Sequence, residues 1–187
     1  MEIKAIEMLK EEHRMIDELV DILDTSIDRA ERPDGLSPHL IDKEIEFCRD
    51  FIGKWHEMKE EEILIPELQR RGYPLDRGPI FDTIEDHRKG RSILRRLVAT
   101  GKISDPNERV KSFAKFASAY SLYLYEHIRE EEGGLLHAAE LSIEDQDKEE
   151  IDKKFSKINK ELDNKGGREK YKRILESRRE ELDNSAR

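Results

Sequence analysis

Six side chains with metal-binding chemistry stand at positions where the surrounding pattern calls for apolar residues. They are four histidines and two glutamates: His13, His56, Glu60, His87, His127 and Glu131. Burying a carboxylate without compensation is costly, and a buried imidazole also needs partners. Because a shared cation would satisfy the whole set, the pattern predicts a metal site in the protein interior.

The spacing of these residues indicates how many metal ions the site would hold. His56 and Glu60 are four residues apart, as are His127 and Glu131. On a helix, this spacing puts both side chains on one face, one turn apart. One such pair carries little information in a chain rich in Glu, and a lone core histidine is more often structural. Two pairs, with an in-register histidine on each of two further segments, favour a binuclear metal site in a bundle core.

Four segments of the chain must position these residues, and each carries apolar residues every three or four positions. This is the period of an amphipathic helix, and no segment alternates with the period of a strand. Turn, cap and break signals separate the segments, at residues 32–35, 37–38, 72, 78–79, 101 and 105–108, with a glycine pair at 133–134 that weakens the last segment. The sequence therefore predicts an all-α protein, an antiparallel up-down four-helix bundle, in which His13 and His56 meet at one level.

A C-terminal extension follows the four segments. We expect the bundle to occupy residues 1–141, and residues 142–187 to form one or two extra helices that pack on the bundle or project from it. Ile151 and Phe155 lie on one face of the first extra helix, and residues 165–167 break the extension. Its last part is a charged helix with a thin apolar stripe that includes Tyr171 and Leu175, and its Lys and Arg residues are compatible with a homodimer or with docking of a partner.

Composition excludes several classes of function. Of 187 residues, 42% are charged and 35% are hydrophobic, with a net charge of -9. Such a composition is also typical of disordered chains, but the apolar stripes at helical spacing exclude disorder. The negative charge argues against nucleic acid. A single cysteine, Cys48, permits no internal disulfide framework. With no membrane-length apolar run and no signal-peptide core, we expect a cytoplasmic protein. Hydrolase triads, phosphate loops and zinc-finger cysteine sets are also missing.

The order and spacing of these motifs resemble the hemerythrin-like proteins of the HHE cation-binding group, over about residues 1–163. The segments that carry the resemblance are residues 12–13, 56–66, 78–80, 86–91, 127–132 and 135–136. The resemblance implies a hemerythrin-like bundle around a non-heme di-iron centre. His13, His56, His87 and His127 would then be terminal ligands, with Glu60, Glu131 and an oxo or hydroxo group as bridges. Iron or manganese suits these donors, and zinc is a possible substitute.

One departure from the oxygen-carrying hemerythrins is informative. Those proteins have two histidines four residues apart on the third helix, whereas His87 here has Thr83 before it and Arg91 after it at that spacing. The missing imidazole leaves an open position on each iron, which Tyr123, Glu57 or water could fill. This favours reaction with a small molecule, or sensing of one, over simple oxygen carriage.

We therefore expect a di-iron protein that binds, senses or reduces oxygen, nitric oxide (a diatomic ligand like oxygen) or peroxide; whether it is an enzyme stays open. One alternative is iron storage or donation for the repair of iron–sulfur clusters, although relatives with that role carry an added N-terminal cysteine-bearing domain. Another is a metal-binding interaction module without catalysis.

The remaining candidates are expected to be structural. His39 and His137 should lie at the surface, and Cys48 should be a core residue. Tyr120 and Tyr123 should pack in the core on the side of the site. In the acidic runs at residues 60–62 and 130–132, we expect only Glu60 and Glu131 to point inward, with solvated flanks.

Overall fold

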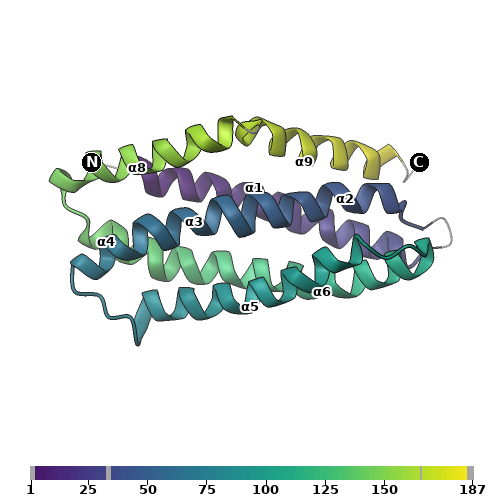
Figure 1. The fold of residues 1–187 in the computed structure, drawn as a ribbon, viewed down its shortest axis with the longest axis horizontal. Helices are drawn as coiled ribbons and strands as arrows, with labels where there is room; N and C mark the ends of the chain where they lie inside the picture. Colours follow the sequence, from purple (N-terminus) through teal and green to yellow (C-terminus); the bar gives the residue numbers. More distant parts are fainter. Residues whose placement is uncertain (1–2, 33–34, 165, 185–187) are drawn as a thin grey trace.

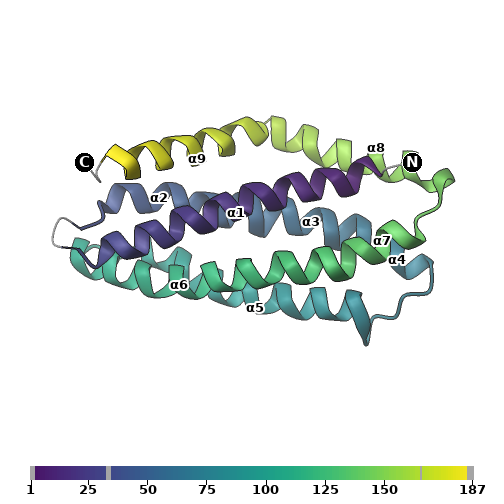
Figure 2. The ribbon, with the colours of Figure 1, turned by 180° about the vertical axis from the view of Figure 1, so that it is seen from behind.

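Four long helices form an antiparallel bundle in the computed structural model, which describes residues 3–32, 35–164 and 166–184 (Figures 1 and 2). The all-α bundle with extra C-terminal helices is thereby confirmed. The first helix is α1 (Lys4–Ala30) and the third is α5 (Gly78–Thr100). The second consists of α2 (Pro38–Glu46), η1 (Phe47–His56), α3 (Glu57–Lys59), η2 (Glu60–Leu64) and α4 (Ile65–Arg70). The fourth consists of α6 (Pro106–Glu131), η3 (Glu132–Leu136) and α7 (His137–Ser142).

The helix boundaries follow the cap signals only in part. The side chain of Asp105 accepts a hydrogen bond from the backbone N–H of Glu108 at 2.8 Å, as expected at the start of α6. Ser37 is the residue before α2, but its side chain makes no such bond. The fourth helix continues through the glycine pair at 133–134 to Ser142. Pro33, Asp34 and Lys165, which belong to expected breaks, lie outside the described residues.

Short π-helical stretches lie next to the candidate metal ligands. His56 is the last residue of η1, Glu60 is the first residue of η2, and η3 begins directly after Glu131. Such stretches are rare, and they are frequent at functional sites because they shift the direction in which side chains point. The apolar stripes did not predict them.

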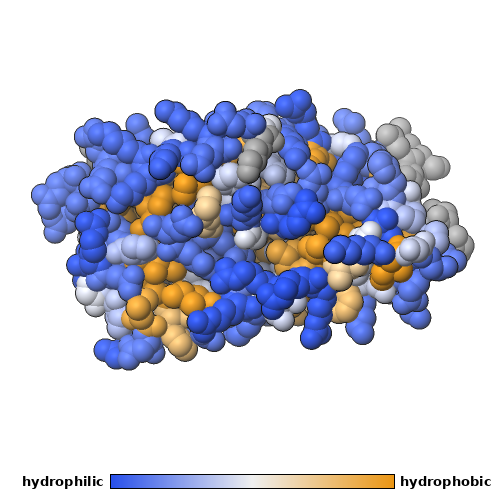
Figure 3. Space-filling view, viewed as in Figure 1, coloured by the Kyte–Doolittle hydropathy of each residue, from blue (hydrophilic) through white to orange (hydrophobic). Residues whose placement is uncertain are grey.

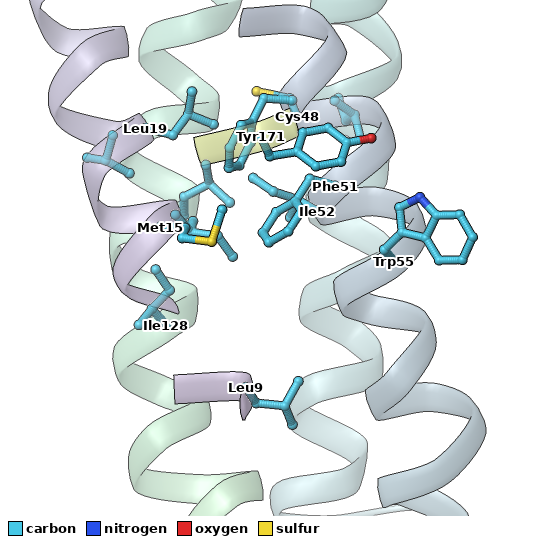
Figure 4. Packing of buried hydrophobic residues seen from close by; sticks show 14 of the residues in the cluster. Leu9, Met15, Leu19, Cys48, Phe51, Ile52, Trp55, Ile128 and Tyr171 are labelled. Atoms are coloured by element: carbon cyan, nitrogen blue, oxygen red, sulfur yellow. The ribbon is translucent and has the colours of Figure 1, made fainter. Parts of the chain in front are cut away.

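The apolar core is divided into layers by the polar residues. Figure 4 shows Leu9 well apart, along the bundle axis, from a group that includes Cys48, Phe51 and Tyr171. All four residues are at most 2% exposed. His13 lies between Leu9 and the next buried aliphatic positions of α1, so the polar layer has apolar packing on both sides.

The C-terminal helices α8 (Asp145–Asp163) and α9 (Gly167–Asn184) lie along α1 and the second long helix (Figures 1 and 2). The carboxylate of Asp152 accepts a hydrogen bond from the backbone N–H of Ala5 at 2.9 Å and so caps α1. The side chains of Tyr171, Leu175 and Leu182 are buried against the bundle. The outer surface along this edge is mostly hydrophilic (Figure 3). None of the described helices combines the length and apolar character needed to cross a bilayer.

Candidate metal centre

The structure brings all six predicted side chains together in the polar layer. His13 comes from α1, His56 and Glu60 from the second helix, His87 from α5, and His127 and Glu131 from α6. None of the six is more than 2% exposed. Ligand atoms of His13, His56, Glu60 and Glu131 lie within 4.8 Å of one another, as do those of His87, His127 and Glu131.

The histidines form two pairs. The ring centroids of His13 and His56 are 5.0 Å apart, and those of His87 and His127 are 5.2 Å apart. Glu131 belongs to both halves, because its Oε2 lies 3.4 Å from Nε2 of His13 and 3.5 Å from Nε2 of His127. These two pairs, with a carboxylate between them, give the centre two halves.

Glu60 spans the same two halves. Its Oε1 lies 3.5 Å from Nε2 of His56, and its Oε2 lies 3.4 Å from Nε2 of His87. A carboxylate with one oxygen toward each pair has the disposition of a bridging ligand. The two glutamates and two histidine pairs thus have the arrangement of a binuclear site.

Several polar atoms at the centre are buried without a hydrogen-bond partner among the described residues. They include Nε2 of His13, His56 and His127, both carboxylate oxygens of Glu60, and Oε2 of Glu131. Such orphaned buried groups are rare and costly in folded proteins. Cations between these nitrogen and oxygen donors would satisfy them, so the residues fit a metal centre.

Each histidine is held from outside by a second carboxylate. The Nδ1 atoms of His13, His56, His87 and His127 lie 3.1, 3.1, 2.8 and 2.8 Å from oxygens of Glu132, Glu12, Glu61 and Asp86, respectively. An ionised carboxylate only accepts, so Nδ1 carries a hydrogen in each pair and Nε2 is the ring nitrogen that faces the centre. This is the usual support of a metal-binding imidazole.

Sequence reasoning missed these outer carboxylates. Glu61 and Glu132 were expected to be solvated flanks, but their carboxylates contact His87 and His13. Both side chains are partly solvated, as expected, but the expectation that neither points inward was wrong, because side chains at the edge of the polar layer still reach the imidazoles. The only signal in the sequence was that an acidic residue directly precedes His13 and His87.

The charges of the metal-free centre are strongly coupled. Burial opposes ionisation of Glu12, but the hydrogen bond from His56 and the charge of Lys59 outweigh it and lower its pKa to about 2. The hydrogen bond with His87 lowers the pKa of Glu61 to about 2. Burial opposes the charged form of His13, but Glu131 outweighs it and raises the pKa of His13 to about 9. Protons on these imidazoles must leave when a metal binds.

The positions one turn from His87 differ in character. Arg91 turns away from the centre and donates hydrogen bonds to Glu57 and Glu61, each at 2.7 Å. Thr83 is buried, and it lines a pocket of about 620 Å³ between the start of α5 and the end of α6. Burial raises the pKa of the Glu57 carboxyl to about 7.

The pocket lies beside the His87 and His127 half of the centre, although neither histidine lines it. Asp86 and Glu131 contribute to its wall, as does Thr83. Gly133 and Gly134 form part of the rim, and a methyl group added at Gly133 would meet no atom within 4 Å. The rim is therefore open where these residues lack side chains.

Tyr123 packs directly on the centre. Its ring lies 5.1 Å from that of His127 with the planes 17° apart, and the ring of Tyr120 stacks behind it at 5.6 Å. Both hydroxyls are buried without a hydrogen-bond partner among the described residues. As expected, both tyrosines and Cys48 are buried, while His39 and His137 are exposed.

Comparison with known proteins identifies a family for most of the chain. A model of the hemerythrin HHE cation-binding domain matches residues 4–139, which include all six residues of the candidate centre. No curated protein and no solved structure matches the chain significantly.

Proposed function

The chain belongs to the hemerythrin HHE cation-binding domain family, and from this premise we propose that it is a non-heme di-iron protein that binds, senses or reduces a small oxidant. The ligand would be oxygen, peroxide or nitric oxide. The proposed ligands are His13, His56 and Glu60 with Glu131 in one half, and His87 and His127 with the same two bridging carboxylates in the other. Zinc or manganese could replace iron at these donors.

The observation that carries this proposal is the set of unpartnered donor atoms at the centre. Three imidazole Nε2 atoms and three carboxylate oxygens are buried there without hydrogen-bond partners among the described residues. A purely structural role for the histidines would leave these atoms unsatisfied, at a cost of about 1–3 kcal/mol for each group. Imidazole nitrogens with bridging carboxylates suit iron, and iron in turn supplies redox chemistry and a binding position for a small ligand.

The pocket beside Thr83 supports access of a ligand to the half that contains His87 and His127. Glu131 is one of the residues that line this pocket, although it is only 2% exposed. No third imidazole lies one turn from His87, because Thr83 and Arg91 occupy those positions. A small molecule would therefore find both a path and a free position on this side.

The decisive experiment is metal analysis of the full chain together with absorption spectra before and after air, peroxide and nitric oxide. We expect two irons per chain and a spectrum that changes with the oxidant. The matched variants are His56→Ala, in the centre, and His137→Ala, at the surface; only the first should lose iron. A colourless protein that retains no iron after anaerobic reconstitution would contradict the proposal, as would a His56→Ala variant that loses stability but keeps its metal.

A further inference from the structure

The carboxylate that orients His56 is held by two cations from different parts of the chain. Oε2 of Glu12 accepts from Nδ1 of His56 at 3.1 Å. Oε1 of Glu12 accepts from Nζ of Lys59 and from Nη2 of Arg168, the latter at 3.2 Å. Glu12 and Lys59 are fully buried. Arg168 lies in the first turn of α9, outside the residues 4–139 that the family model matches.

Arg168 also contacts a second carboxylate, at the edge of this cluster. Nη1 of Arg168 also donates to Oε2 of Glu11 at 3.0 Å, so two carboxylates face two cations. The Glu11 side chain is 58% exposed, whereas Glu12 is fully buried and depends on donors from the protein. Arg168 adds a second charged donor to the oxygen that Lys59 also contacts, and so it helps to hold the ionised Glu12 in the orientation that His56 requires.

The local structure of α9 fixes Arg168 at this level of the bundle. Gly166 and Gly167 have φ values of 101° and 63°, which let the chain turn sharply between α8 and α9. One turn beyond Arg168, the ring of Tyr171 packs 5.5 Å from that of Phe47 and 5.0 Å from that of Phe51. The guanidinium therefore sits at the end of a packed helix.

Farther along α9, Arg178 anchors the helix from inside the protein. Its side chain is fully buried, and its Nε donates to Glu44 at 2.8 Å while its Nη2 donates to Ser26 at 3.1 Å. These contacts join α9 to α2 and α1. Arg168 thus belongs to a helix that is tied to the bundle over most of its length.

The other three outer carboxylates have no such contact with α9 among the described residues. Glu61 is held by Arg91 of α5, and the contacts described for Asp86 and Glu132 lie within the four bundle helices. The influence of α9 is therefore directed at one half of the centre, the half that contains His13 and His56.

We infer that Arg168 is a positioning residue of the metal centre, through which the C-terminal helix α9 sets the metal affinity of the His13 and His56 half by holding Glu12 against His56. This inference rests on the proposed metal centre. The C-terminal extension then contributes to metal binding, and the two metal positions should respond differently to a change in α9.

The test uses the full chain and compares Arg168→Gln with Arg179→Gln. Arg179 lies on the same helix and also faces α1, with its Nη2 3.7 Å from Glu18, but it does not contact the centre. Fe(II) would be titrated anaerobically against a chelator, and Co(II) would serve as a spectroscopic probe of each position. We expect Arg168→Gln to weaken one of the two positions about 10–100-fold and to alter its Co(II) spectrum. Arg179→Gln should match the original protein, and Arg168→Lys should recover most of the affinity.

The outcomes separate this inference from the proposed function. If the original chain binds no metal, the proposed function fails. If it binds two metals and Arg168→Gln retains both affinities and the Co(II) spectrum of Arg179→Gln, the role of Arg168 is overturned. Should Arg168→Gln fail to fold, the double variant Glu11→Gln/Arg168→Gln takes its place, because it removes a charge pair and leaves the net charge unchanged. A loss of affinity at one metal position in the double variant then supports the role of Arg168, and unchanged affinities and an unchanged Co(II) spectrum overturn it.

Discussion

Asp86 of α5 and His127 of α6 are joined by a 2.8 Å contact between a carboxylate oxygen and Nδ1 of the imidazole. This contact crosses from one helix to its neighbour, and it turns the free Nε2 of His127 toward Glu131, 3.5 Å away. The orientation of a proposed ligand thus depends on a residue one position before another proposed ligand, His87.

Removing this contact should weaken metal binding in one half of the centre. We expect Asp86→Ala to lower the affinity of the His87 and His127 position about 10–100-fold, because the imidazole loses the partner that fixes its tautomer and ring orientation. Chelator competition measures this affinity. Asp82→Ala is the control, since Asp82 lies one turn earlier on α5 and lines the same pocket. Equal affinities in the two variants would rule out an orienting role for Asp86.

The stability of the metal-free protein should fall as pH rises. The folded state raises the pKa of His13 to about 9, against about 6.5 in an unfolded chain, so it binds more protons between these values. The stabilisation is complete below pH 6.5 and is lost as pH rises through 9, an effect on the order of 3 kcal/mol for His13 alone. Urea unfolding in the presence of a chelator at pH 6, 7.5 and 9 would measure it.

Two controls accompany the pH series. His13→Ala should weaken the dependence, whereas His137→Ala, at the surface and away from the centre, should preserve it. Metal affinity should change in the opposite direction, rising over the same pH range because protons compete with the metal for the imidazole. A metal-free protein that becomes more stable between pH 6.5 and 9 would contradict the assigned charges.

Gly90 lies so close to Tyr123 that an alanine should destabilise the protein. Replacing a glycine inside a helix by alanine ordinarily gains about 1 kcal/mol. An added Cβ at Gly90 would overlap Cζ of Tyr123, whose ring is stacked between Tyr120 and His127. We therefore expect Gly90→Ala to cost about 1–3 kcal/mol in urea unfolding.

The matched control for Gly90 is Gly133→Ala. A methyl group at Gly133 meets no atom within 4 Å, so this variant should be neutral or more stable. Gly90→Ala should also perturb the spectrum of the bound metal, because displacement of Tyr123 moves the ring of His127. Stabilisation by both alanines would show that the Tyr123 ring does not occupy this position.

The helices and the six central residues were accessible from sequence because each follows a local period. Apolar residues at every third or fourth position predict a buried helix face, and a polar residue in such a stripe predicts an unusual partner. The spacing of His56 and Glu60 then depends only on helix geometry. These inferences need no knowledge of which helices are neighbours.

The outer contacts were not accessible, because they depend on the packing of neighbouring helices. The chain has 44 Asp and Glu residues, so nothing local singles out Glu61 or Asp86 as the partner of a histidine on another helix. The buried Lys59 and Arg178 are equally hidden, since both lie on highly charged helices. The partner of Lys59, Glu12, becomes evident only when α1 is packed beside the second long helix, and the partner of Arg178, Glu44, only when α9 is placed on the bundle.

A histidine at position 83 should close the proposed ligand path. Thr83 is one turn before His87 on the same face of α5, and it lines the pocket that reaches Glu131. An imidazole there would fill the inner end of the pocket and supply a further donor to the His87 and His127 half. We expect Thr83→His to retain two irons per chain and to react with nitric oxide at least about tenfold more slowly, as one lost decade corresponds to 1.36 kcal/mol in the barrier. Stopped-flow absorption measures this rate.

Thr83→Val is the control, because it keeps the size of the side chain without adding a ligand, and it should react at the original rate. A Thr83→His variant that reacts equally fast with full iron content would show that the small molecule reaches the centre by another route.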